Sequence, residues 1–565
     1  MKVVGIEGFD PSNLVERAGR DGRAGGVAGA PAPPPGPVAS WASMESFTAA
    51  ERARLAPHFT SVDEPVFALV NLPETVKGAL FARYSRYPGT LRRLFLDEFA
   101  DSLPEQADAW DAGEGERAAR LYERIFLGYG DDSVAQLGGA HVACEWVSNV
   151  LTKVLQRPRL AAYLEQSTRY IAYDQPMPGG GYRYHRDPSL GPEYEAAMDA
   201  LFDTYSAALP KVAAWVDASF PGDPSPARTR AVQAKALDLL RGLLPAASLS
   251  HMGIYASGQT YEQLILHLLA HPLPEARRVG EGVLAAVKAV MPSFVARVER
   301  PDRGGEWIEY LRARDAAAER WTARLGLDDA SAAARDEGPS VRLLHVDGDE
   351  ESLLAALLFE AAGVSEEETR LRLSALGPEE RARMLADLVG ERRNRRHRPG
   401  RGFEALRYRF EIVSDYGAFR DLQRHRMLTV QWQRLGPHLG AEVPEEVEAA
   451  GCGDAYRRAL EVSRAEWERL AAEGREREAL YALCLGFRIR YILDCNAREA
   501  MQLIELRSGR EGHPSYRAVA HEMHRLIASV HPAVANAMVH VDHETEPRLE
   551  RILAEMRTEA KRAAV

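Results

Sequence analysis

Arginines, a hydroxyl and a carboxylate crowd one short segment in the first half of the chain. Arg157 and Arg159 flank a proline, and Glu165, Ser167 and Arg169 follow closely. Guanidinium groups match phosphate oxygens, a serine hydroxyl donates one more hydrogen bond, and a carboxylate accepts from an N–H or a sugar hydroxyl. The segment therefore suits a phosphorylated, hydrogen-bonding ligand. Exposed ion pairs at a junction between a helix and a loop are the alternative.

A second cluster, Arg424-His425-Arg426, lies in the second half. Apolar residues flank it, namely Met427, Leu428, Val430 and Trp432. Such flanks predict that the cluster lies against a core, where an arginine needs anionic partners. A solvated surface is the alternative for an isolated Arg-His-Arg.

A third cluster runs from Asn496 to Arg507. On a helix, Arg498, Gln502 and Glu505 would lie along one face, and Asn496 would largely share it. This pattern predicts a polar face for a ligand. Pairing between arginine and glutamate within the helix would explain much of the same pattern.

These clusters need a scaffold, and most of the chain shows the three- and four-residue apolar spacing of helices. Shorter runs rich in β-branched and aromatic residues predict strands. The fold class is therefore α+β with helix dominant. Helices are expected at Arg117–Phe126, Leu237–Leu244, Tyr261–Leu269, Val279–Val290 and Ala518–Val530, and strands at Ser340–Val346 and Leu406–Ser414.

The two halves of the chain echo each other. The segments 147–159 and 413–426 share a Val-Ser start and a closing run of arginines, and Arg424 and Arg157 are 424 − 157 = 267 residues apart. This indicates a duplicated domain. We expect a flexible Gly-, Ala- and Pro-rich tail at 1–42, a first repeat at 43–300, a linker with a helix at 301–339, a second repeat at 340–550 and a C-terminal helix end or tail at 551–565.

Bulk composition narrows the classes of function. The 565 residues carry a net charge of −11 and 27% charged residues, which is typical of a globular protein that repels nucleic acid. The four cysteines are too scattered for a disulfide framework or a zinc site, and no metal site is expected. No apolar run approaches the roughly 20 residues of a membrane span. We therefore expect a cytoplasmic protein with no membrane partner.

The first cluster resembles the signature of flavin-dependent thymidylate synthases (the ThyX family). That signature reads Arg-His-Arg, seven residues, then Ser, usually within Asn-Glu-x-Ser-x-Arg-Tyr. The first half departs from it at Pro158 and Leu164, and the second half has Arg434 in place of the serine. The matching residues are Arg157, Arg159, Glu165, Ser167, Arg169 and Tyr170 in the first half and Arg424, His425 and Arg426 in the second.

Two further elements carry the resemblance. The segment from Asn496 to Arg507 resembles the family's later Asn-x-Arg helix. Arg241-Gly-Leu-Leu-Pro245 matches its Arg-x-x-Leu-Pro element, where the second half has Tyr481 in place of the arginine. The first half thus lacks the His of the Arg-His-Arg, which the second half keeps. The second half lacks the signature Ser and the Arg of the Arg-x-x-Leu-Pro element, which the first half keeps. The resemblance covers about residues 70–300 and 340–535 and implies two tandem domains, each helix-rich with a small antiparallel sheet.

The resemblance also implies a role for each matching residue. Arg241, Arg424 and Arg507 would be catalytic, stabilising negative charge on a uracil ring. Glu165, Ser167, Arg169, Arg241 and Arg507 would bind the nucleotide. Arg157, Arg159, Arg424, His425, Arg426, Asn496 and Gln502 would bind the flavin.

A reaction and an assembly are implied by the same resemblance. The implied reaction converts dUMP to dTMP with FAD as cofactor and with NADPH and methylenetetrahydrofolate as co-substrates. Because the family's active site lies between subunits, the chain would be a pseudo-dimer with one intact composite site. Two chains would form a homodimer that rebuilds the family's four-domain assembly.

Three other functions stay open from the sequence. The departures at Pro158 and Arg434 are compatible with a flavin enzyme acting on another pyrimidine nucleotide, or with an inactive binding homologue. The basic run from Arg392 to Arg401 could instead bind nucleic acid, with steep salt dependence. Its lack of interleaved aromatic residues and the acidic chain argue against that function.

Overall fold

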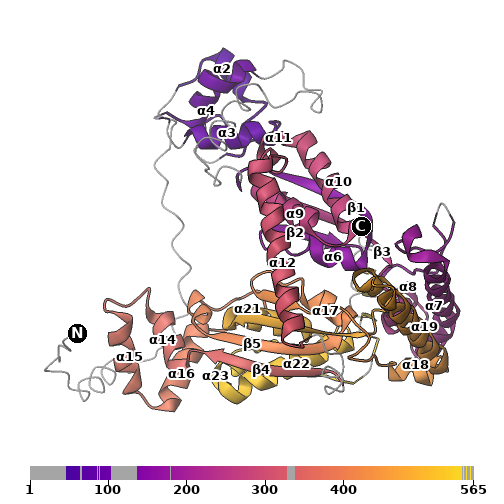
Figure 1. Ribbon diagram of the computed structural model, residues 1–565. Coiled ribbons are helices and arrows are strands. Elements are labelled where there is room, and N and C mark those ends of the chain that lie inside the picture. The colour runs from indigo at the N-terminus through magenta and orange to yellow at the C-terminus, as the bar shows by residue number, and fades with distance from the viewer. Residues whose placement is uncertain are drawn as a thin grey trace.

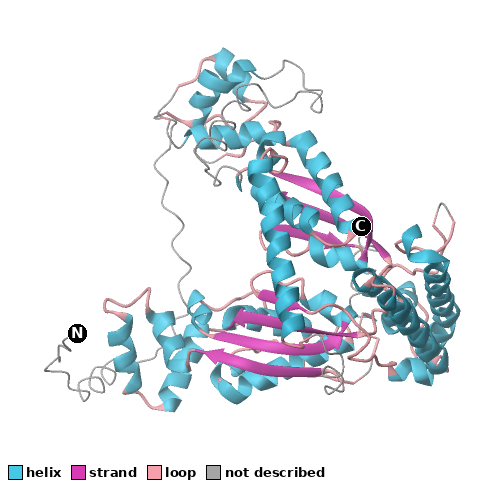
Figure 2. Cartoon of the chain, viewed as in Figure 1, coloured by secondary structure: helices cyan, strands magenta, loops and turns pink. Residues whose placement is uncertain are grey.

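The computed structural model describes residues 46–102, 136–327, 338–556 and 560, apart from 64–66, 85, 86, 88, 178, 179, 547, 550, 553 and 554. The chain forms two tandem α+β domains, each built on a small antiparallel sheet (Figures 1 and 2). This confirms the predicted fold class. Within the described residues, no helix is long and apolar enough to cross a membrane.

The first sheet has the strand order β1-β3-β2, with β1 at Gly139–Ser148, β3 at Leu249–Ser257 and β2 at Ala161–Glu165. Residues along β3 alternate between buried and less buried, so one face packs on the core. Short helix α6 (Asn149–Leu155) follows β1, and the Ser148 hydroxyl caps it by accepting a hydrogen bond from the Leu151 N–H. Helices α9 (Gly258–Ala270) and α10 (Pro274–Val290) complete this domain's core.

The second sheet has the same order with one more strand at its edge, β4-β5-β7-β6. Its elements are β4 at Ser340–Asp347, β5 at Arg407–Asp415, α17 at Tyr416–Leu422, β6 at Thr429–Trp432, β7 at Arg488–Asn496, α21 at Ala497–Arg507, α22 at Pro514–Val530 and α23 at Pro532–Asn536. The helices α6 and α17 each have 7 residues, and α10 and α22 each have 17. The repeat predicted from the sequence is therefore present in the three shared strands of each sheet and in the helices that follow them.

The remaining helices surround these sheets. Helix α7 of the first repeat packs against α8 of its own repeat and against α19 of the second, and α12 runs from the first sheet toward the second (Figure 1). Their bounds are α2 Ala49–Leu55, α3 Glu74–Tyr84, α4 Leu91–Leu94, α7 Gly191–Ser219, α8 Pro226–Leu240, α11 Pro292–Val295, α12 Glu306–Arg324, α14 Glu350–Leu358, α15 Glu366–Ser374, α16 Pro378–Val389, α18 Glu445–Ala449, α19 Gly453–Ala472 and α20 Glu476–Ala479.

Two segments, 241–247 and 481–486, cross at the centre of the molecule. Each donates two backbone hydrogen bonds to the other and accepts two. They run from Ala246 N to Leu483 O (2.7 Å), Ala247 N to Tyr481 O (3.0 Å), Leu485 N to Leu244 O (2.9 Å) and Gly486 N to Gly242 O (2.9 Å). The crossing is buried. Its hydrogen bonds form two equivalent pairs, since 485 − 246, 483 − 244, 486 − 247 and 481 − 242 are all 239, so the two repeats are related there by a pseudo-twofold. It therefore fixes which end of one repeat faces which end of the other.

Most of the expected elements are observed. The strand predicted at Ser340–Val346 and the helices at Tyr261–Leu269, Val279–Val290 and Ala518–Val530 lie within β4, α9, α10 and α22. The strand predicted at Leu406–Ser414 is β5, which begins one residue later. The helix expected at Leu237–Leu244 is wrong at its end, because α8 stops at Leu240 and Leu244 is extended at the crossing. The expected helix Arg117–Phe126 and the expected tail lie outside the described residues. The domain boundaries stay predictions.

Gly242 allows the close approach at the crossing. A Cβ added there would lie 2.0 Å from the Tyr456 hydroxyl oxygen, and Tyr456 is buried on α19. We expect Gly242→Ala to lower the stability by about 1–3 kcal/mol, as overpacking does in a tight core. Thermal unfolding checks this. Adding Tyr456→Phe should restore part of the loss, and Gly282→Ala, whose Cβ would meet nothing within 4 Å, is the control.

Candidate functional site

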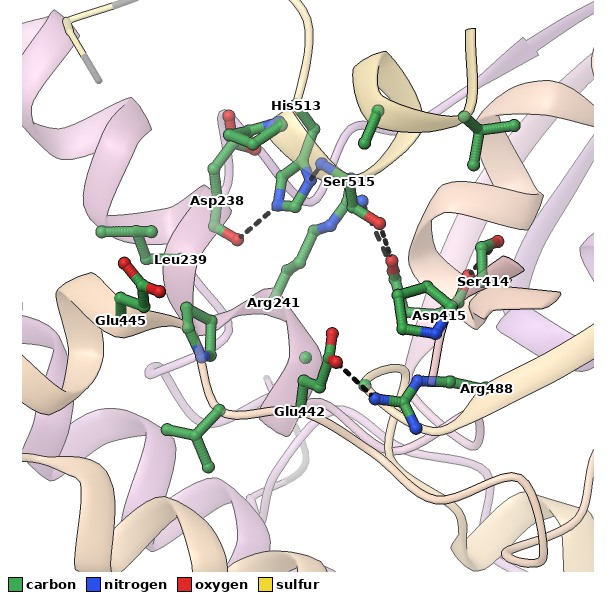
Figure 3. Close-up of a pocket in the computed structure, with 18 of the residues that line it drawn as sticks. Asp238, Leu239, Arg241, Ser414, Asp415, Glu442, Glu445, Arg488, His513 and Ser515 are labelled. Carbon is green, nitrogen blue, oxygen red and sulfur yellow. Dashed lines mark hydrogen bonds and ion pairs between the residues drawn. The ribbon is translucent and has the colours of Figure 1, made fainter. Parts of the chain in front are cut away.

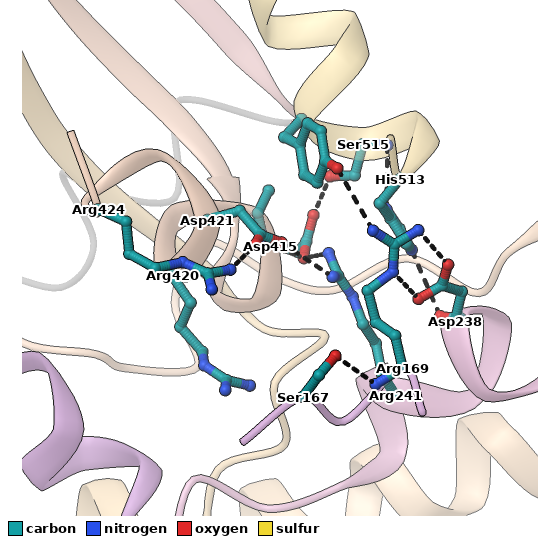
Figure 4. A network of polar contacts seen from close by, with 12 residues as sticks. Ser167, Arg169, Asp238, Arg241, Asp415, Arg420, Asp421, Arg424, His513 and Ser515 are labelled. Carbon is teal, nitrogen blue, oxygen red and sulfur yellow. Dashed lines mark hydrogen bonds and ion pairs between the residues drawn. The ribbon is translucent and has the colours of Figure 1, made fainter. Parts of the chain in front are cut away.

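Arg169 of the first repeat reaches into the second repeat. Its Nε and Nη2 each donate to a carboxylate oxygen of Asp238 at 2.5 Å. Figure 4 shows Arg169 facing Asp238. The Arg169 Nη1 donates to the Tyr516 hydroxyl at 3.4 Å, and its Nη2 donates to the Glu511 carbonyl at 3.3 Å. Ser167 lies beside it, and its hydroxyl accepts from the Arg169 N–H at 3.2 Å. The carboxylate of Asp238 thus holds the guanidinium in place.

Arg241 sits at the start of the crossing segment and is buried. Its Nη1 donates to Asp421 at 3.2 Å, and its Nη2 lies 3.7 Å from Asp415. That Nη2 has no hydrogen-bond partner among the described residues, although it is buried. Asp415 also accepts from the Ser515 hydroxyl. Arg241 therefore joins the first repeat to the end of β5 and keeps one donor free for a ligand.

Glu165 anchors a buried ion network between the repeats. Its carboxylate accepts from Arg420 at 2.8 Å, from Lys153 at 3.1 Å and from Gln156 at 3.0 Å. The side chains of Glu165 and Lys153 are each 2% exposed. Burial lowers the pKa of Lys153 to about 7, against the pull of the Glu165 charge. In this structure Glu165 contacts protein cations, so its role toward a nucleotide stays a prediction.

His425 and Arg507 form one unit. The Arg507 Nε donates to the His425 Nε2 at 3.0 Å, and the other ring nitrogen of His425 lies 3.0 Å from the Glu499 carboxylate. The ring therefore carries its proton on Nδ1 and is neutral, because Nε2 must accept. Burial also lowers the pKa of His425, and the Arg507 charge adds to that. Within the described residues Arg507 has no carboxylate partner, and it lies over the ring of Tyr516 at 5.5 Å.

The other predicted site residues differ from one another in exposure and in hydrogen-bond partners. Arg424 is 41% exposed and bonds Asp421, while Arg426 bonds the Ala161 carbonyl. The Asn496 side chain caps α21. The Gln502 Oε1 is buried with no hydrogen-bond partner among the described residues.

Arg157 and Arg159 do not join the others. Arg157 lies over the Trp432 ring at 5.7 Å, and Arg159 bonds Thr429 at 3.0 Å, on the other side of the interface between the repeats.

One chain thus brings together the site residues that the two repeats have retained. We call this set the composite cluster. From the first repeat it contains Ser167, Arg169, Asp238 and Arg241, and from the second it contains Asp415, Arg420, Asp421, Arg424, Arg507, Ser515 and Tyr516. Its arginines and hydroxyls converge at one interface, which suits an anionic ligand.

A cavity of about 740 Å³ opens beside the cluster (Figure 3). It lies between the end of α8, the segment 442–446 that leads into α18, and the start of α22, and Arg241, Asp415 and Ser515 line it. Arg488 and Glu442 pair across it at 2.6 Å. Its size falls in the range of small-molecule sites.

Sequence reasoning missed Tyr516 and His513, both at the start of α22. Burial acts to raise the pKa of Tyr516, but the charges of Arg169, Arg507 and Arg241 outweigh it and hold that pKa below its ordinary value. Burial, with Arg241 and Arg169 nearby, keeps the pKa of His513 well below its usual range. A Pro-Ser-Tyr at a helix start is common, so only the fold singles these residues out.

Comparison with known proteins decides the family. Residues 92–293 and 347–533 match the family described as thymidylate synthase complementing protein. The chain belongs to this family. The first matched region contains all three strands of the first sheet, and the second contains β5, β6 and β7 of the second sheet, so the family's domain occurs twice in tandem here.

Relatives of the same length exist. The chain is 37% identical to a UPF0159 protein of Chlamydia pneumoniae, over 91% of this chain and 98% of that one. It is 31% identical to a UPF0159 protein of Thermoplasma acidophilum, over 86% and 99% of the two chains. Among solved structures, a UMP/dUMP methylase PolB from Streptomyces cacaoi bound with 5-Br dUMP matches at 18% identity, with a TM-score of 0.30, over 37% of this chain and 99% of that one.

Arg392, the first residue of the basic run, makes a buried ion pair that stabilises the fold. Arg392 makes a bidentate ion pair with Glu505 at 2.6 Å, and the two side chains are 3% and 0% exposed. We expect Arg392→Ala to cost about 3–5 kcal/mol of stability, because it leaves a buried carboxylate unpaired. The neighbouring Arg393→Ala, whose side chain is 75% exposed, should leave the melting temperature unchanged. Thermal unfolding of both variants checks this.

The His425 unit predicts a pH dependence. The pKa of His425 is lower in the folded protein than in the unfolded chain. Below about pH 6.5 the unfolded chain therefore binds more protons than the folded protein does. Stability should therefore fall as the pH drops from 7 toward 5. His425→Gln should remove part of that loss, so its melting temperature changes less over the same range than that of the wild type. Equal slopes for the two proteins would contradict the assignment.

Proposed function

We propose that this protein is a flavin-dependent thymidylate synthase that methylates dUMP to dTMP with FAD, NADPH and methylenetetrahydrofolate. The observation that carries the proposal is the composite cluster. Arg169 and Arg241 of the first repeat meet Arg424 and Arg507 of the second repeat within one chain. Membership of the thymidylate synthase complementing protein family supports the same reaction class.

The nucleotide would bind at the interface between the repeats. Arg507 lacks a carboxylate partner among the described residues and lies over the Tyr516 ring, and Arg169 donates to the hydroxyl of the same Tyr516 side chain. Together they offer two guanidinium groups to one phosphate. Ser167 adds a hydroxyl beside them.

The flavin would bind on the side of Arg424. The residues there fit an anionic cofactor, because Arg424 and Arg426 are exposed cations and the Gln502 amide oxygen is buried without a partner among the described residues. When bound, the flavin carries the hydride for the reaction. The protein supplies orientation and charge. Arg241, fixed by Asp415 and Asp421, is the buried cation that would stabilise negative charge on the uracil ring.

The spectrum of the purified protein tests the cofactor. We expect a flavin band near 450 nm after addition of FAD, and a shift of that band on addition of dUMP. Release of tritium from uracil C5 of labelled dUMP, dependent on methylenetetrahydrofolate and NADPH, would then establish the reaction. The same assay with labelled UMP distinguishes the other pyrimidine nucleotide. A protein that takes up no FAD would contradict the proposal.

Arg507 is the sharpest single test of the nucleotide site. We expect Arg507→Ala to weaken dUMP binding roughly 10- to 100-fold, since a hydrogen bond to a charged group contributes about 1.5–3 kcal/mol. Arg507→Lys should recover part of the loss. Arg457→Ala, an exposed arginine paired with Glu448 and Asp454, is the control for charge. Calorimetric titration with dUMP measures all four proteins.

Assembly of two chains into a pseudo-tetramer belongs to the same proposal. Light scattering on the eluting protein gives its mass directly. A mass of two chains supports the predicted homodimer.

A further inference from the structure

The two repeats also meet at a second place. Because they are related by a pseudo-twofold at the crossing, this place lies on the opposite side of the crossing from the composite cluster. Positions of the composite cluster in the segments 153–167 and 420–434 have counterparts at this second place, 267 residues away in the sequence. Examples are 420 − 153 = 267, 424 − 157 = 267 and 434 − 167 = 267. Lys153 and Arg157 of the first repeat there face Trp432, Gln433 and Arg434 of the second. We call this second meeting point the twin site.

The twin site holds a cavity of about 430 Å³. Its charged and titratable lining residues are Lys153, Arg157, His271, Arg434 and Arg477, with no carboxylate among the described residues that line it. An apolar side made by Tyr416, Val430, Trp432 and Leu480 completes it. The volume is within the range of small-molecule sites, and the lining combines cations with flat aromatic surface.

Substitutions between the repeats explain why this cavity is basic. Glu165 and Asp421 neutralise arginines in the composite cluster, whereas the corresponding positions of the twin site are Trp432 and Val154, since 432 − 165 = 267 and 421 − 154 = 267. Arg434 stands where the composite cluster has its serine. The twin site has therefore lost carboxylates and gained a cation and an indole.

The charge balance of the lining leaves room for an anion. Lys153 pairs with Glu165 behind the cavity, and Glu319 of α12 lies 2.9 Å from Arg477 and 3.4 Å from Arg434. Glu476 lies 3.6 Å from Arg434.

Two lining groups, Arg157 and His271, make no ion pair with a described residue, although the charge of the Asp315 carboxylate acts on both. Arg157 makes no ion pair with any described residue and rests on the Trp432 ring. His271 is neutral near pH 7, because burial and the charge of Arg157 lower its pKa to about 4.

We propose that the twin site binds a nucleoside monophosphate and is distinct from the composite cluster. The phosphate would lie among Arg157, Arg434 and Arg477, where guanidinium groups from both repeats converge. The base would lie on the apolar side beside Trp432. The site would select the phosphate and a flat ring, and Gln431 and Gln433 are the lining amides that could contact the base edge.

Equilibrium dialysis of the full-length protein with labelled dUMP, dTMP and AMP tests this. We expect at least one of them to bind at a site whose affinity falls 10-fold or more in R434A/R477A and is unchanged in Arg169→Ala. R434K/R477K should retain binding, which separates lost charge from lost structure. The control R300A/R525A removes two exposed, ion-paired arginines elsewhere.

The outcomes are separable from those of the proposed reaction. R434A/R477A should keep the flavin band and its response to dUMP, whereas Trp432→Phe should abolish any quenching of tryptophan fluorescence by the ligand at the twin site. Unchanged binding of all three nucleotides in R434A/R477A would overturn the proposal. So would inorganic phosphate binding as tightly as every nucleotide, because the ring would then contribute nothing. Neither result bears on whether the composite cluster is catalytic.

Discussion

The backbone crossing of segments 241–247 and 481–486 is the constraint on which the rest of the structure depends. Four hydrogen bonds join two buried segments that carry no charge of their own apart from Arg241. Buried backbone groups must be paired, so the crossing tolerates little displacement. Because it sits on the pseudo-twofold, it brings opposite ends of the two repeats together on each side, and this arrangement creates both the composite cluster and the twin site.

The arginines of the composite cluster are held by carboxylates rather than left free. Asp238 fixes Arg169, and Asp415 and Asp421 fix Arg241. Buried cations need such partners, and a guanidinium whose position is already fixed loses less entropy when a ligand binds. Arg507 differs, because a neutral His425 orients it without cancelling its charge.

Duplication within one chain has let the two meeting points diverge. In an assembly of identical subunits, a change at one site appears at every site. Here Ser167 and Arg434 occupy corresponding positions but differ, as do Arg241 and Leu480. The crossing relates the repeats there by 480 − 241 = 239 residues, so the sequence match of Arg241 to Tyr481 is wrong by one residue. Arg241 pairs with Asp415 and Asp421 in the composite cluster, while its counterpart Leu480 adds apolar surface to the twin site. The same scaffold therefore presents two chemically different interfaces.

The sequence alone determined the duplication, the α+β class and the clusters of polar residues. Helical and strand periodicity arise from local side-chain patterns, so α9, α10, α22, β4 and β5 were predictable, and the matched segments around Arg157 and Arg424 indicated the repeat. The tertiary structure decided which cluster faces which. Tyr516 and His513 contact the first repeat only because α22 begins beside Asp238, and Arg157 lies at the twin site only because of the crossing. Such contacts join residues hundreds of positions apart, and no local pattern in a single sequence encodes them.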